Sequence, residues 1–271
     1  MRVAFQGEPG AFSEAASFGF FESPETVPYE SFEAVFEAVS SNACGYGLIP
    51  IENSLAGSIH QNYDLLLRNQ LSIVGEYFLR VELCLIGFPG TRKAGIEKVI
   101  SHPQPLGQCA VYLHKLGVKT EAVYDTAGSV KLLKSSGEKT TAAIASRRAA
   151  ELYGMEILEE NIEDNLENYT RFLAIAAQPI LPEGEAKTSI VFSLKNQPGA
   201  LFKALSVFAL REIDLTKIES RPLQGKPWEY LFYIDFLGAL QEERVKRALD
   251  HLGEYAPMLR AFGSYERAKP A

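Results

Sequence analysis

The chain has 271 residues, of which 46% are hydrophobic and 23% are charged, and its formal net charge is −7. A chain of this length can bury a full core and more than one domain, and its composition is typical of a globular protein. The negative charge argues against a nucleic-acid partner, which would be expected to meet a basic face. No apolar run approaches the ~20 residues that span a bilayer, so we expect no membrane partner.

The chain opens with MRVAFQG, a pattern that predicts a strand and not a signal peptide, so we expect a cytoplasmic protein. The three cysteines, Cys44, Cys84 and Cys109, lie far apart without a CxxC motif, which indicates reduced thiols. The four histidines show no metal-ligand spacing. The loop QGEPGAFS matches neither GxGxxG nor a phosphate-binding loop. We therefore predict no metal and no cofactor.

The first 178 residues alternate short apolar strands with amphipathic segments, which predicts an α/β region with a mainly parallel sheet. The expected strands cover residues 2–6, 46–51, 71–77, 81–87, 98–101, 119–123, 141–145 and 170–176. The expected helices cover residues 31–40, 105–115 and 146–153. In such a fold the active site lies at the carboxyl ends of the strands, so the loops found there carry the candidate residues.

A turn-rich segment, PILPEGEA at residues 179–186, predicts a domain boundary. The elements expected after it are strand 188–194, helix 199–212, strands 215–222 and 228–236, helix 241–254 and strand 259–265. This βαββαβ order is the ferredoxin-like α+β arrangement. We therefore expect an α/β domain over residues 1–180 and a small α+β domain over residues 187–266.

The segment LIPIENSLAGSI places an acid, an amide and a hydroxyl directly after an apolar strand. If the strand ends at Ile51, then Glu52, Asn53 and Ser54 lie on a loop that leads into a helix. Asn53 or Ser54 can then cap that helix. The same helix N-terminus, with Gly57 nearby, can also receive a carboxylate. A structural cap and a carboxylate-binding site are equally consistent with this pattern.

Three further loops at strand ends carry polar residues. In ISHPQPLGQC, a structural hydrogen bond is favoured for His102 over acid–base chemistry. In NYTRFLAI, Arg171 suits bidentate binding of a carboxylate beside the Thr170 hydroxyl, with an ordinary salt bridge as the alternative. In ASRRAA, Ser146 is placed to cap a helix whose two arginines fit a solvated face. Hydroxyls, amides and arginine with few bases indicate a site that holds carboxylates and positions a leaving group.

The ordered runs IPIENSLAGSI, ISHPQPLGQC, AAIASRRAAELYG and NYTRFLAI resemble the prephenate dehydratase family. The small domain resembles an ACT regulatory module through PGAL and IESRP. The resemblance covers nearly the whole chain, from about residue 2 to residue 266. It implies a catalytic domain of two α/β lobes like those of periplasmic binding proteins. Lobe one would comprise residues 1–77 and 161–180, and lobe two residues 78–160.

The resemblance implies an enzyme, a carbon–oxygen lyase that decarboxylates and dehydrates prephenate to phenylpyruvate in L-phenylalanine biosynthesis. The catalytic residues that it implies are Thr170, Arg171, Ser54, Asn53 and Glu52. The substrate-binding residues that it implies are Phe172, Gln104, Gln108, Ser101, His102, Ala145 and Ser146. The residues that it implies for allosteric feedback inhibition by L-phenylalanine are Asn196, Pro198, Gly199, Ala200, Leu201, Glu219, Ser220, Arg221 and Pro222.

Phenylalanine is expected to bind between two ACT modules, which requires at least a dimer, and the family suggests a homotetramer. Phe202 departs from the smaller or aliphatic residue that often follows PGAL in the family. Two alternatives remain open. The same reaction on arogenate, the amino form of prephenate, would give phenylalanine directly, and one enzyme can accept both. A non-catalytic protein that captures a small dicarboxylate between two lobes is the more distant alternative.

Overall fold

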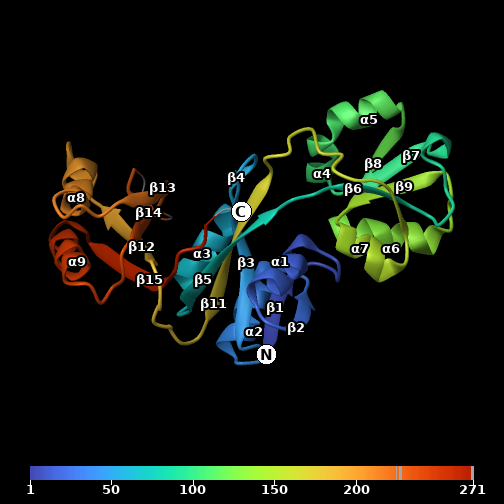
Figure 1. Ribbon diagram of the computed structural model, residues 1–271. Helices are drawn as coiled ribbons and strands as arrows, with labels where there is room; N and C mark the ends of the chain where they lie inside the picture. The colour runs from blue at the N-terminus through green and yellow to red at the C-terminus, as the bar shows by residue number, and fades with distance from the viewer. Residues whose placement is uncertain (224, 226–227, 270–271) are drawn as a thin grey trace. The chain divides into compact units, whose positions relative to one another are not determined.

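The computed structural model describes residues 1–223, 225 and 228–269, and these residues form three β-sheets (Figure 1). The first sheet has the strand order β2-β1-β3-β11-β5, with β4 beside β3. Its strands are β1 (Arg2–Gln6), β2 (Glu25–Tyr29), β3 (Tyr46–Asn53), β4 (Gly57–Ser58), β5 (Ser72–Arg80) and β11 (Tyr169–Ala176). Its helices are α1 (Phe12–Phe20), α2 (Phe32–Ser40) and α3 (His60–Arg68). Strand β1 is parallel to β2 and β3, whereas β4 is antiparallel to β3.

The second sheet has the strand order β10-β6-β9-β7-β8 and is also mixed, since β6 is antiparallel to β9 and β10. Its strands are β6 (Cys84–Gly87), β7 (Lys98–Ser101), β8 (Lys119–Ala122), β9 (Thr141–Ala145) and β10 (Glu156–Glu159). Its helices are α4 (Pro103–Gln108), α5 (Ala110–Leu116), α6 (Thr126–Ser136) and α7 (Arg147–Tyr153), with a 3-10 turn η1 (Lys93–Gly95).

Both faces of the second sheet are covered, with α4 and α5 on one side and α6 and α7 on the other (Figure 1). Side chains alternate between the faces along a strand, so Ile144 of β9 packs in one apolar cluster with Leu113 of α5. Its neighbour Ala143 packs in the other cluster with Val130 of α6. Two sheets with their own helices confirm the expected pair of α/β lobes, although neither sheet is purely parallel.

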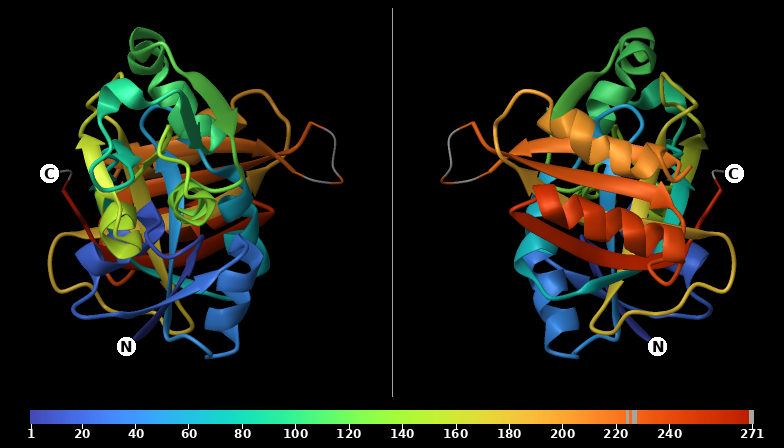
Figure 2. Two further views of the ribbon diagram at one scale, coloured as in Figure 1. Left: turned by 90° about the vertical axis from the view of Figure 1, so that its right-hand side faces the viewer. Right: turned by 90° about the vertical axis from the view of Figure 1, so that its left-hand side faces the viewer.

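The third sheet has the order β13-β14-β12-β15, and its paired strands are antiparallel. Its elements in chain order are β12 (Ala186–Leu194), α8 (Ala200–Ala209), β13 (Leu215–Pro222), β14 (Tyr230–Leu237), α9 (Glu243–Tyr255) and β15 (Met258–Glu266). Helices α8 and α9 cover the same face of this sheet (Figure 2). The expected ferredoxin-like βαββαβ arrangement is confirmed.

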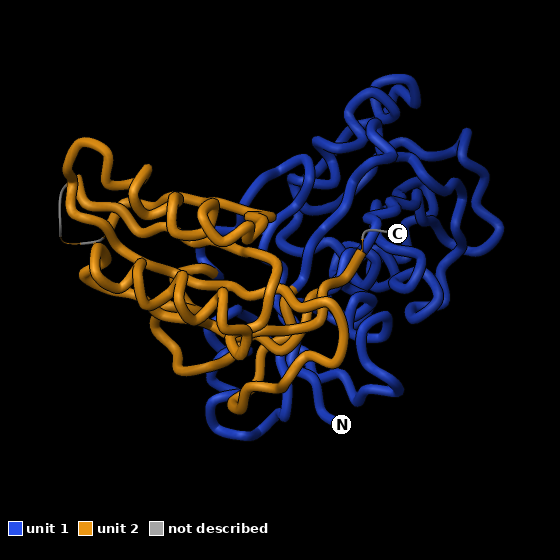
Figure 3. Tube along the Cα trace, turned by 60° about the vertical axis from the view of Figure 1, so that its left-hand side comes forward, with its two compact units in different colours: residues 1–62, 77–172 blue, residues 63–76, 173–271 orange. Residues whose placement is uncertain are grey.

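By contacts in space the chain divides into two compact units, residues 1–62 with 77–172 and residues 63–76 with 173–271 (Figure 3). The first unit holds the second sheet and most of the first. The second unit holds the third sheet together with most of α3, the first half of β5 and the second half of β11. The expected domains, residues 1–180 and 187–266, were defined by the order of elements along the chain and not by contacts in space. Their boundaries therefore stay a prediction.

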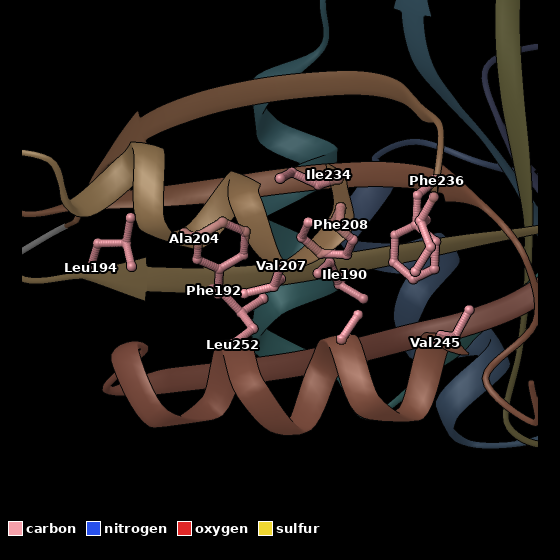
Figure 4. Close-up of a cluster of buried hydrophobic side chains, with 12 residues drawn as sticks. Ile190, Phe192, Leu194, Ala204, Val207, Phe208, Ile234, Phe236, Val245 and Leu252 are labelled. Atoms are coloured by element: carbon pink, nitrogen blue, oxygen red, sulfur yellow. The ribbon is translucent and has the colours of Figure 1, made fainter. Parts of the chain in front are cut away.

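The core of the C-terminal domain lies between its sheet and its two helices (Figure 4). Phe192 of β12, Phe208 of α8 and Phe236 of β14 are fully buried there. The opposite face of the same sheet presents Tyr233, whose ring centroid lies 4.8 Å from that of Tyr63 in α3. Within this unit, the segment from α3 to β5 is therefore held against the sheet of the C-terminal domain.

Two local expectations are wrong. Strand β3 does not end at Ile51 but continues to Asn53 and pairs with β4, because the chain reverses direction there. Neither Asn53 nor Ser54 therefore caps a helix, and α3 begins later, at His60. The helix expected over residues 105–115 is two helices, and it starts earlier, at Pro103. Pro103 takes the first position because a missing N–H costs nothing there.

All three cysteines are buried and carry free thiols, which agrees with the reduced state expected from their spacing. In the described part of the chain, no helix combines the length and apolar character that a membrane span needs. Among the same residues, no group of three or more His, Cys, Asp or Glu side chains could hold a metal ion.

Candidate functional site

A cavity of about 400 Å³ lies in the first unit and is lined by residues from both α/β lobes. This volume is within the range of pockets that enclose small molecules. The lining residues from the first lobe are Gln6, Ala11, Phe12, Ser13, Phe32, Pro50, Asn53, Ile59, Thr170 and Phe172. Those from the linking segment and the second lobe are Val81, His102, Gln104, Pro105, Gln108, Asp125 and Thr126.

Asn53 and Thr170 meet at one wall of this cavity. The Asn53 side-chain amide donates to Thr170 Oγ1 at 3.0 Å and to Asn168 Oδ1 at 2.8 Å. Asn53 ends β3, and Thr170 is the second residue of β11, so the sheet brings the two together. Asn53 is 6% exposed, and its bonds are therefore largely shielded from water.

The direction of the Asn53–Thr170 hydrogen bond is determined by the turn after β3. Asn53 Oδ1 accepts the backbone N–H groups of Leu55 and Ala56 at 3.0 and 2.9 Å. Its amide nitrogen must then face Thr170, and an amide nitrogen can only donate. Thr170 Oγ1 is thus an acceptor in this bond. Its own proton is available for another acceptor, and Thr170 lines the cavity.

Ser54 ties the turn after β3 to the start of β11. Its Oγ donates to the carbonyl of Glu167 and accepts the N–H of Tyr169, both at 2.9 Å. Its own N–H donates to the carbonyl of Tyr169 at 2.8 Å. With both functions of the hydroxyl used, Ser54 positions Asn53 and Thr170 and does not line the cavity.

Arg171 and Glu52 lie outside the cavity lining. Successive side chains of a strand point to opposite faces, so Thr170 and Phe172 line the cavity while Arg171 does not. Arg171 is 4% exposed, and its guanidinium lies 3.5 Å from Glu52 Oε1. This geometry places Arg171 behind the wall of the cavity, as a support for the strand ends that carry Asn53 and Thr170.

The predicted residues of the second lobe are only partly brought to the cavity. His102, Gln104 and Gln108 line it, from the start and end of α4. Ser101 is fully buried and donates to the carbonyl of Ile144 at 2.6 Å. Ala145 is fully buried at the end of β9. Ser146 is buried as well, and its side chain caps α7.

Sequence reasoning missed several cavity residues, namely Gln6, Ser13, Phe32, Asp125 and Thr126. Gln6 ends β1, and Asp125 caps α6, so each stands at a strand-to-helix connection of the expected kind. The expectation that active-site residues lie at the carboxyl ends of strands therefore applied to Gln6 and Asp125 as well. They were not selected as candidates because DTAGS and QGEPG match no compact motif.

The described residues that line the cavity include no Arg or Lys. An anionic ligand would instead meet amides, hydroxyls and helix N-termini. Helix α1 has no side-chain cap at Ala11, and Ala11, Phe12 and Ser13 all line the cavity. Backbone N–H groups and the positive end of the helix dipole are therefore directed to this wall.

The two lobes are joined by hydrogen bonds beside the cavity. Ser146 Oγ donates to the carbonyl of Gly10 at 2.6 Å and accepts the N–H of Ala149 at 3.1 Å. Arg148 Nε lies 2.7 Å from Glu14 Oε2. Burial alone would raise the pKa of Glu14, but the bonds from Arg148 and the Gly10 N–H lower it below its ordinary value. Glu14 is therefore held as a carboxylate.

The predicted phenylalanine-binding residues lie in the segment between β12 and α8, at the start of α8 and on β13. Gly199 has φ +77° and precedes α8 without a side-chain cap. The Ala200 N–H donates to the carbonyl of Gln197 at 3.1 Å, so the N–H groups available to a ligand are those that follow it in the first turn. Glu219, Ser220, Arg221 and Pro222 belong to β13, the edge strand, as the expected strand over residues 215–222 predicts. Arg221 also forms an ion pair with Asp64 of α3 at 2.9 Å.

Comparison with known families gives two matches along the chain. Residues 3–180 match the family model described as prephenate dehydratase, and residues 188–254 match the ACT domain. Among curated proteins, arogenate dehydratase/prephenate dehydratase 1 of Arabidopsis thaliana is 49% identical over 281 residues, covering 98% of this chain and 72% of the relative. Arogenate dehydratase 2 of Petunia hybrida is 47% identical over 98% of this chain and 71% of its own length.

Among solved structures, prephenate dehydratase from Arthrobacter aurescens in complex with L-Phe has a TM-score of 0.91 and 30% identity. The match covers 100% of this chain and 92% of that one. A structure described as GqqA, a novel type of quorum-quenching acylase, has a TM-score of 0.92 and 35% identity. It covers 99% of this chain and 98% of the neighbour.

Proposed function

This chain belongs to the prephenate dehydratase family of carbon–oxygen lyases and carries an ACT domain, and on this premise we propose that it converts prephenate to phenylpyruvate. This reaction belongs to L-phenylalanine biosynthesis. The observation that carries the proposal is the Asn53–Thr170 hydrogen bond at the wall of the cavity. It leaves the Thr170 hydroxyl proton free for donation to a ligand, at a site that offers amides and helix N-termini to carboxylates.

The reaction needs a hydrogen-bond donor more than it needs a base. The bond between the ring carbon and the leaving carboxylate breaks, and its electron pair moves through the ring. The carbon–hydroxyl bond at the opposite ring position then breaks, and the hydroxide takes up a proton and leaves as water. The ring becomes aromatic, and carbon dioxide is released. Because the carboxylate supplies the electrons, no general base is required.

We assign Thr170 the role of donating a hydrogen bond to the departing hydroxyl. The Thr170 oxygen accepts from Asn53, so its proton can point to the substrate without competition from that neighbour. Threonine is a weak acid, so this bond stabilises the developing hydroxide while water supplies the proton. A donor aimed at developing charge in a shielded site typically accelerates a reaction by ~10²–10³.

We assign the carboxylates of the substrate to the wall formed by the α1 N-terminus and the amides of Gln6, Gln104 and Gln108. These groups line the same cavity as Thr170. Backbone N–H groups and side-chain amides bind a carboxylate without a nearby cation. In this assignment Arg171 does not bind the substrate. It supports the strand ends that carry Asn53 and Thr170, since it lies beside Glu52 behind the cavity wall.

We further propose that L-phenylalanine binds to the ACT domain and inhibits the reaction. One structural neighbour is described as a complex with L-Phe, which supports this assignment. The uncapped start of α8 at Gly199 offers N–H groups for the amino-acid carboxylate. The edge strand β13 offers a surface on which a second copy can extend the sheet. A homodimer or homotetramer is proposed on this ground, and the cytoplasmic location stays a prediction.

The acylase activity named for one neighbour is not proposed for this chain. Acyl transfer needs a nucleophile within hydrogen-bond reach of a base. Among the described residues of the cavity, no hydroxyl is hydrogen-bonded to His102, whose Nδ1 accepts the backbone N–H of Gln104 at 3.3 Å.

The test is a turnover assay of the purified chain on prephenate, with phenylpyruvate measured directly. Turnover that L-phenylalanine suppresses supports both parts of the proposal. Turnover without any response to L-phenylalanine keeps the reaction and removes the regulatory part. Binding of prephenate without turnover contradicts the enzymatic proposal and supports a carboxylate-binding protein.

A further inference from the structure

A second cavity, of about 600 Å³, lies in the C-terminal domain and is lined by residues that follow α8 and by residues of α9. Its volume is within the range of pockets that enclose small molecules. The described residues that line it are mostly basic, namely Leu210, Arg211, Glu243, Arg244, Arg247 and His251. A chain with a net charge of −7 thus has a pocket in which three arginines face a single carboxylate among the described residues.

The basic residues of α9 lie along one side of the helix. Arg244, Arg247 and His251 form a stripe, because residues three and four positions apart are neighbours on a helix surface. Val245 and Leu252, on the adjacent side, are fully buried and point into the core (Figure 4). The core therefore fixes the rotation of α9 about its axis, and the basic stripe faces the residues that follow α8.

Arg211 joins this pocket from a different element. It lies just after the end of α8, and its Nη1 donates to the carbonyl of Val207 at 2.9 Å, which holds the side chain in place. A guanidinium has five N–H donors, so most of those of Arg211 are left for another acceptor. Within the described part of the chain, Arg211 forms no ion pair. An ion pair, the usual explanation of a surface arginine, therefore does not account for it.

The two arginines of α9 have partners that occupy only part of each guanidinium. Arg247 Nε lies 2.8 Å from Glu243 Oε1, and both side chains are 69% exposed. Arg244 Nε lies 2.8 Å from Glu242 Oε2. Such exposed pairs are weak and are screened by salt, so they do not prevent a ligand from binding. A solvated helix face would explain these two residues, but it does not explain why Arg211 meets them.

The spacing of the basic side chains indicates a ligand with more than one anionic group. Positions 244 and 251 are seven residues apart, which is about 10 Å along a helix. A phosphoryl group presents three acceptor oxygens, so it can accept from two guanidinium groups at once. A carboxylate has only two oxygens, and one arginine fork uses both. Linked phosphoryl groups therefore fit this row of arginines better than a dicarboxylate does.

We propose that this pocket binds a small molecule that carries two or more linked phosphoryl groups, the chemistry shared by nucleoside triphosphates and inorganic polyphosphate. Arg211 and Arg247 bind the phosphoryl oxygens from the two sides of the pocket. Leu210, which is 76% exposed, offers an apolar contact to the rest of the ligand. The site lies at the opposite end of α8 from Gly199, so it is separate from the residues proposed for L-phenylalanine.

The test is a calorimetric titration of the full chain at low salt with sodium tripolyphosphate and, separately, with ATP. Saturable binding to the wild type is expected. In Arg211→Gln the dissociation constant should rise about 10- to 100-fold, the usual effect of losing a hydrogen bond to a charged group. Tighter binding of ATP would identify a nucleotide as the ligand, and tighter binding of tripolyphosphate would identify the polyphosphate chain itself. Both results support the site.

Arg247→Gln is the second variant, and it should weaken binding in the same way. Its side chain is 69% exposed, so it provides the answer if Arg211→Gln, which loses the bond to Val207, does not fold. The matched control is Lys246→Gln. Lys246 is an exposed cation of the same helix that does not line the pocket. Its dissociation constant should stay within about threefold of the wild type, because charges outside the pocket are screened.

Three results would overturn the inference. The first is the absence of saturable binding of either probe to the wild type. The second is binding that both arginine variants leave unchanged, or that Lys246→Gln weakens as much as they do, since the attraction would then be to positive charge in general. The third is sodium citrate that binds as tightly as tripolyphosphate, which would remove the assignment to phosphoryl groups. Each leaves the proposed function intact, because turnover of prephenate is measured separately.

Discussion

The side-chain amide of Asn53 lies 3.0 Å from the hydroxyl oxygen of Thr170, although 117 positions separate the two residues in the sequence. The amide is oriented by Leu55 and Ala56, so the bond runs from Asn53 to Thr170. The Thr170 hydroxyl proton is therefore free for the substrate, and the proposed chemistry depends on it. Variants of Thr170 and of Asn53 test this arrangement from both ends of the bond.

Thr170→Ala is expected to lower kcat by ~10²–10³, because the hydrogen bond to the departing hydroxyl is lost. Thr170→Ser keeps a hydroxyl on the same atom and should retain most of the activity. Steady-state kinetics on prephenate measures both variants. Equal losses in Ala and Ser would show that the hydroxyl is not the group that matters.

Asn53→Asp tests the same bond from its other end. The Leu55 and Ala56 N–H groups can still be accepted by one carboxylate oxygen. The second oxygen would then face Thr170 Oγ1 and Asn168 Oδ1, where an amide donor stood before. Thr170 would donate to this introduced carboxylate and not to the substrate, so kcat should fall about as far as in Thr170→Ala. Near-wild-type kcat in a folded Asn53→Asp variant would argue against the assigned direction of the bond.

The ion pair between Glu14 and Arg148 should make stability depend on pH. The pKa of Glu14 is lowered in the folded protein, so its contribution is fully present above the unfolded value near 4.5 and is lost as the pH falls through the folded value. Arg148→Met should reduce the free energy of unfolding by about 1–3 kcal/mol at pH 7. Urea unfolding at pH 7 and pH 4 should show this difference shrinking in acid.

Arg147→Met is the matched control for the Glu14–Arg148 pair. Arg147 is the neighbouring arginine on α7, and it pairs with Glu160, with both side chains close to half exposed. Exposed pairs of this kind contribute at most about 1 kcal/mol. If Arg147→Met reduced the free energy of unfolding as much as Arg148→Met, the burial of Glu14 would not contribute to the strength of its ion pair.

Gly10 allows the first lobe to approach α7 closely. It has φ +93°, and a Cβ atom placed on it would lie 2.9 Å from Ala149 Cα. Gly10→Ala should therefore reduce the free energy of unfolding by more than the ~1–2 kcal/mol expected from left-handed backbone strain alone. It should also impair turnover, because the adjacent residues line the cavity. Gly90→Ala is the control, since Gly90 has φ +79° with no atom within 4 Å of an added Cβ. Equal changes in thermal stability for the two variants would contradict the role of close approach.

Glu76 in β5 and Lys187 in β12 form a buried ion pair, and replacing only one of the two residues should destabilise the protein. The two groups lie 2.6 Å apart, and their side chains are 0% and 7% exposed. Lys187→Met leaves a buried carboxylate without its lysine and should reduce the free energy of unfolding by about 3–5 kcal/mol. The double variant Glu76→Leu/Lys187→Met should be more stable than Lys187→Met in urea unfolding. A double variant that is less stable would show that the carboxylate is satisfied by its other bonds.

Local pattern predicted much of this fold, because strand alternation and helix periodicity are encoded over a few residues. The helix over residues 31–40 and the βαββαβ order after residue 187 follow from such patterns. The end of β3 did not follow, because it depends on pairing with β4, and a two-residue strand leaves almost no pattern. Asp125 was missed because its segment DTAGS matches no compact motif, although it stands at a strand-to-helix connection of the expected kind.

The amino-acid sequence by itself determined many of the elements, the family and part of the set of polar residues at strand ends, since each depends on short ordered stretches. Only the tertiary structure decided which of those residues meet. It turned Thr170 to the cavity and Arg171 behind it, because neighbouring side chains of a strand point to opposite faces. It also brought Asp125 into the same cavity as Thr170, from a different lobe. Such distances between remote residues depend on how whole sheets pack, and no short stretch of sequence contains them.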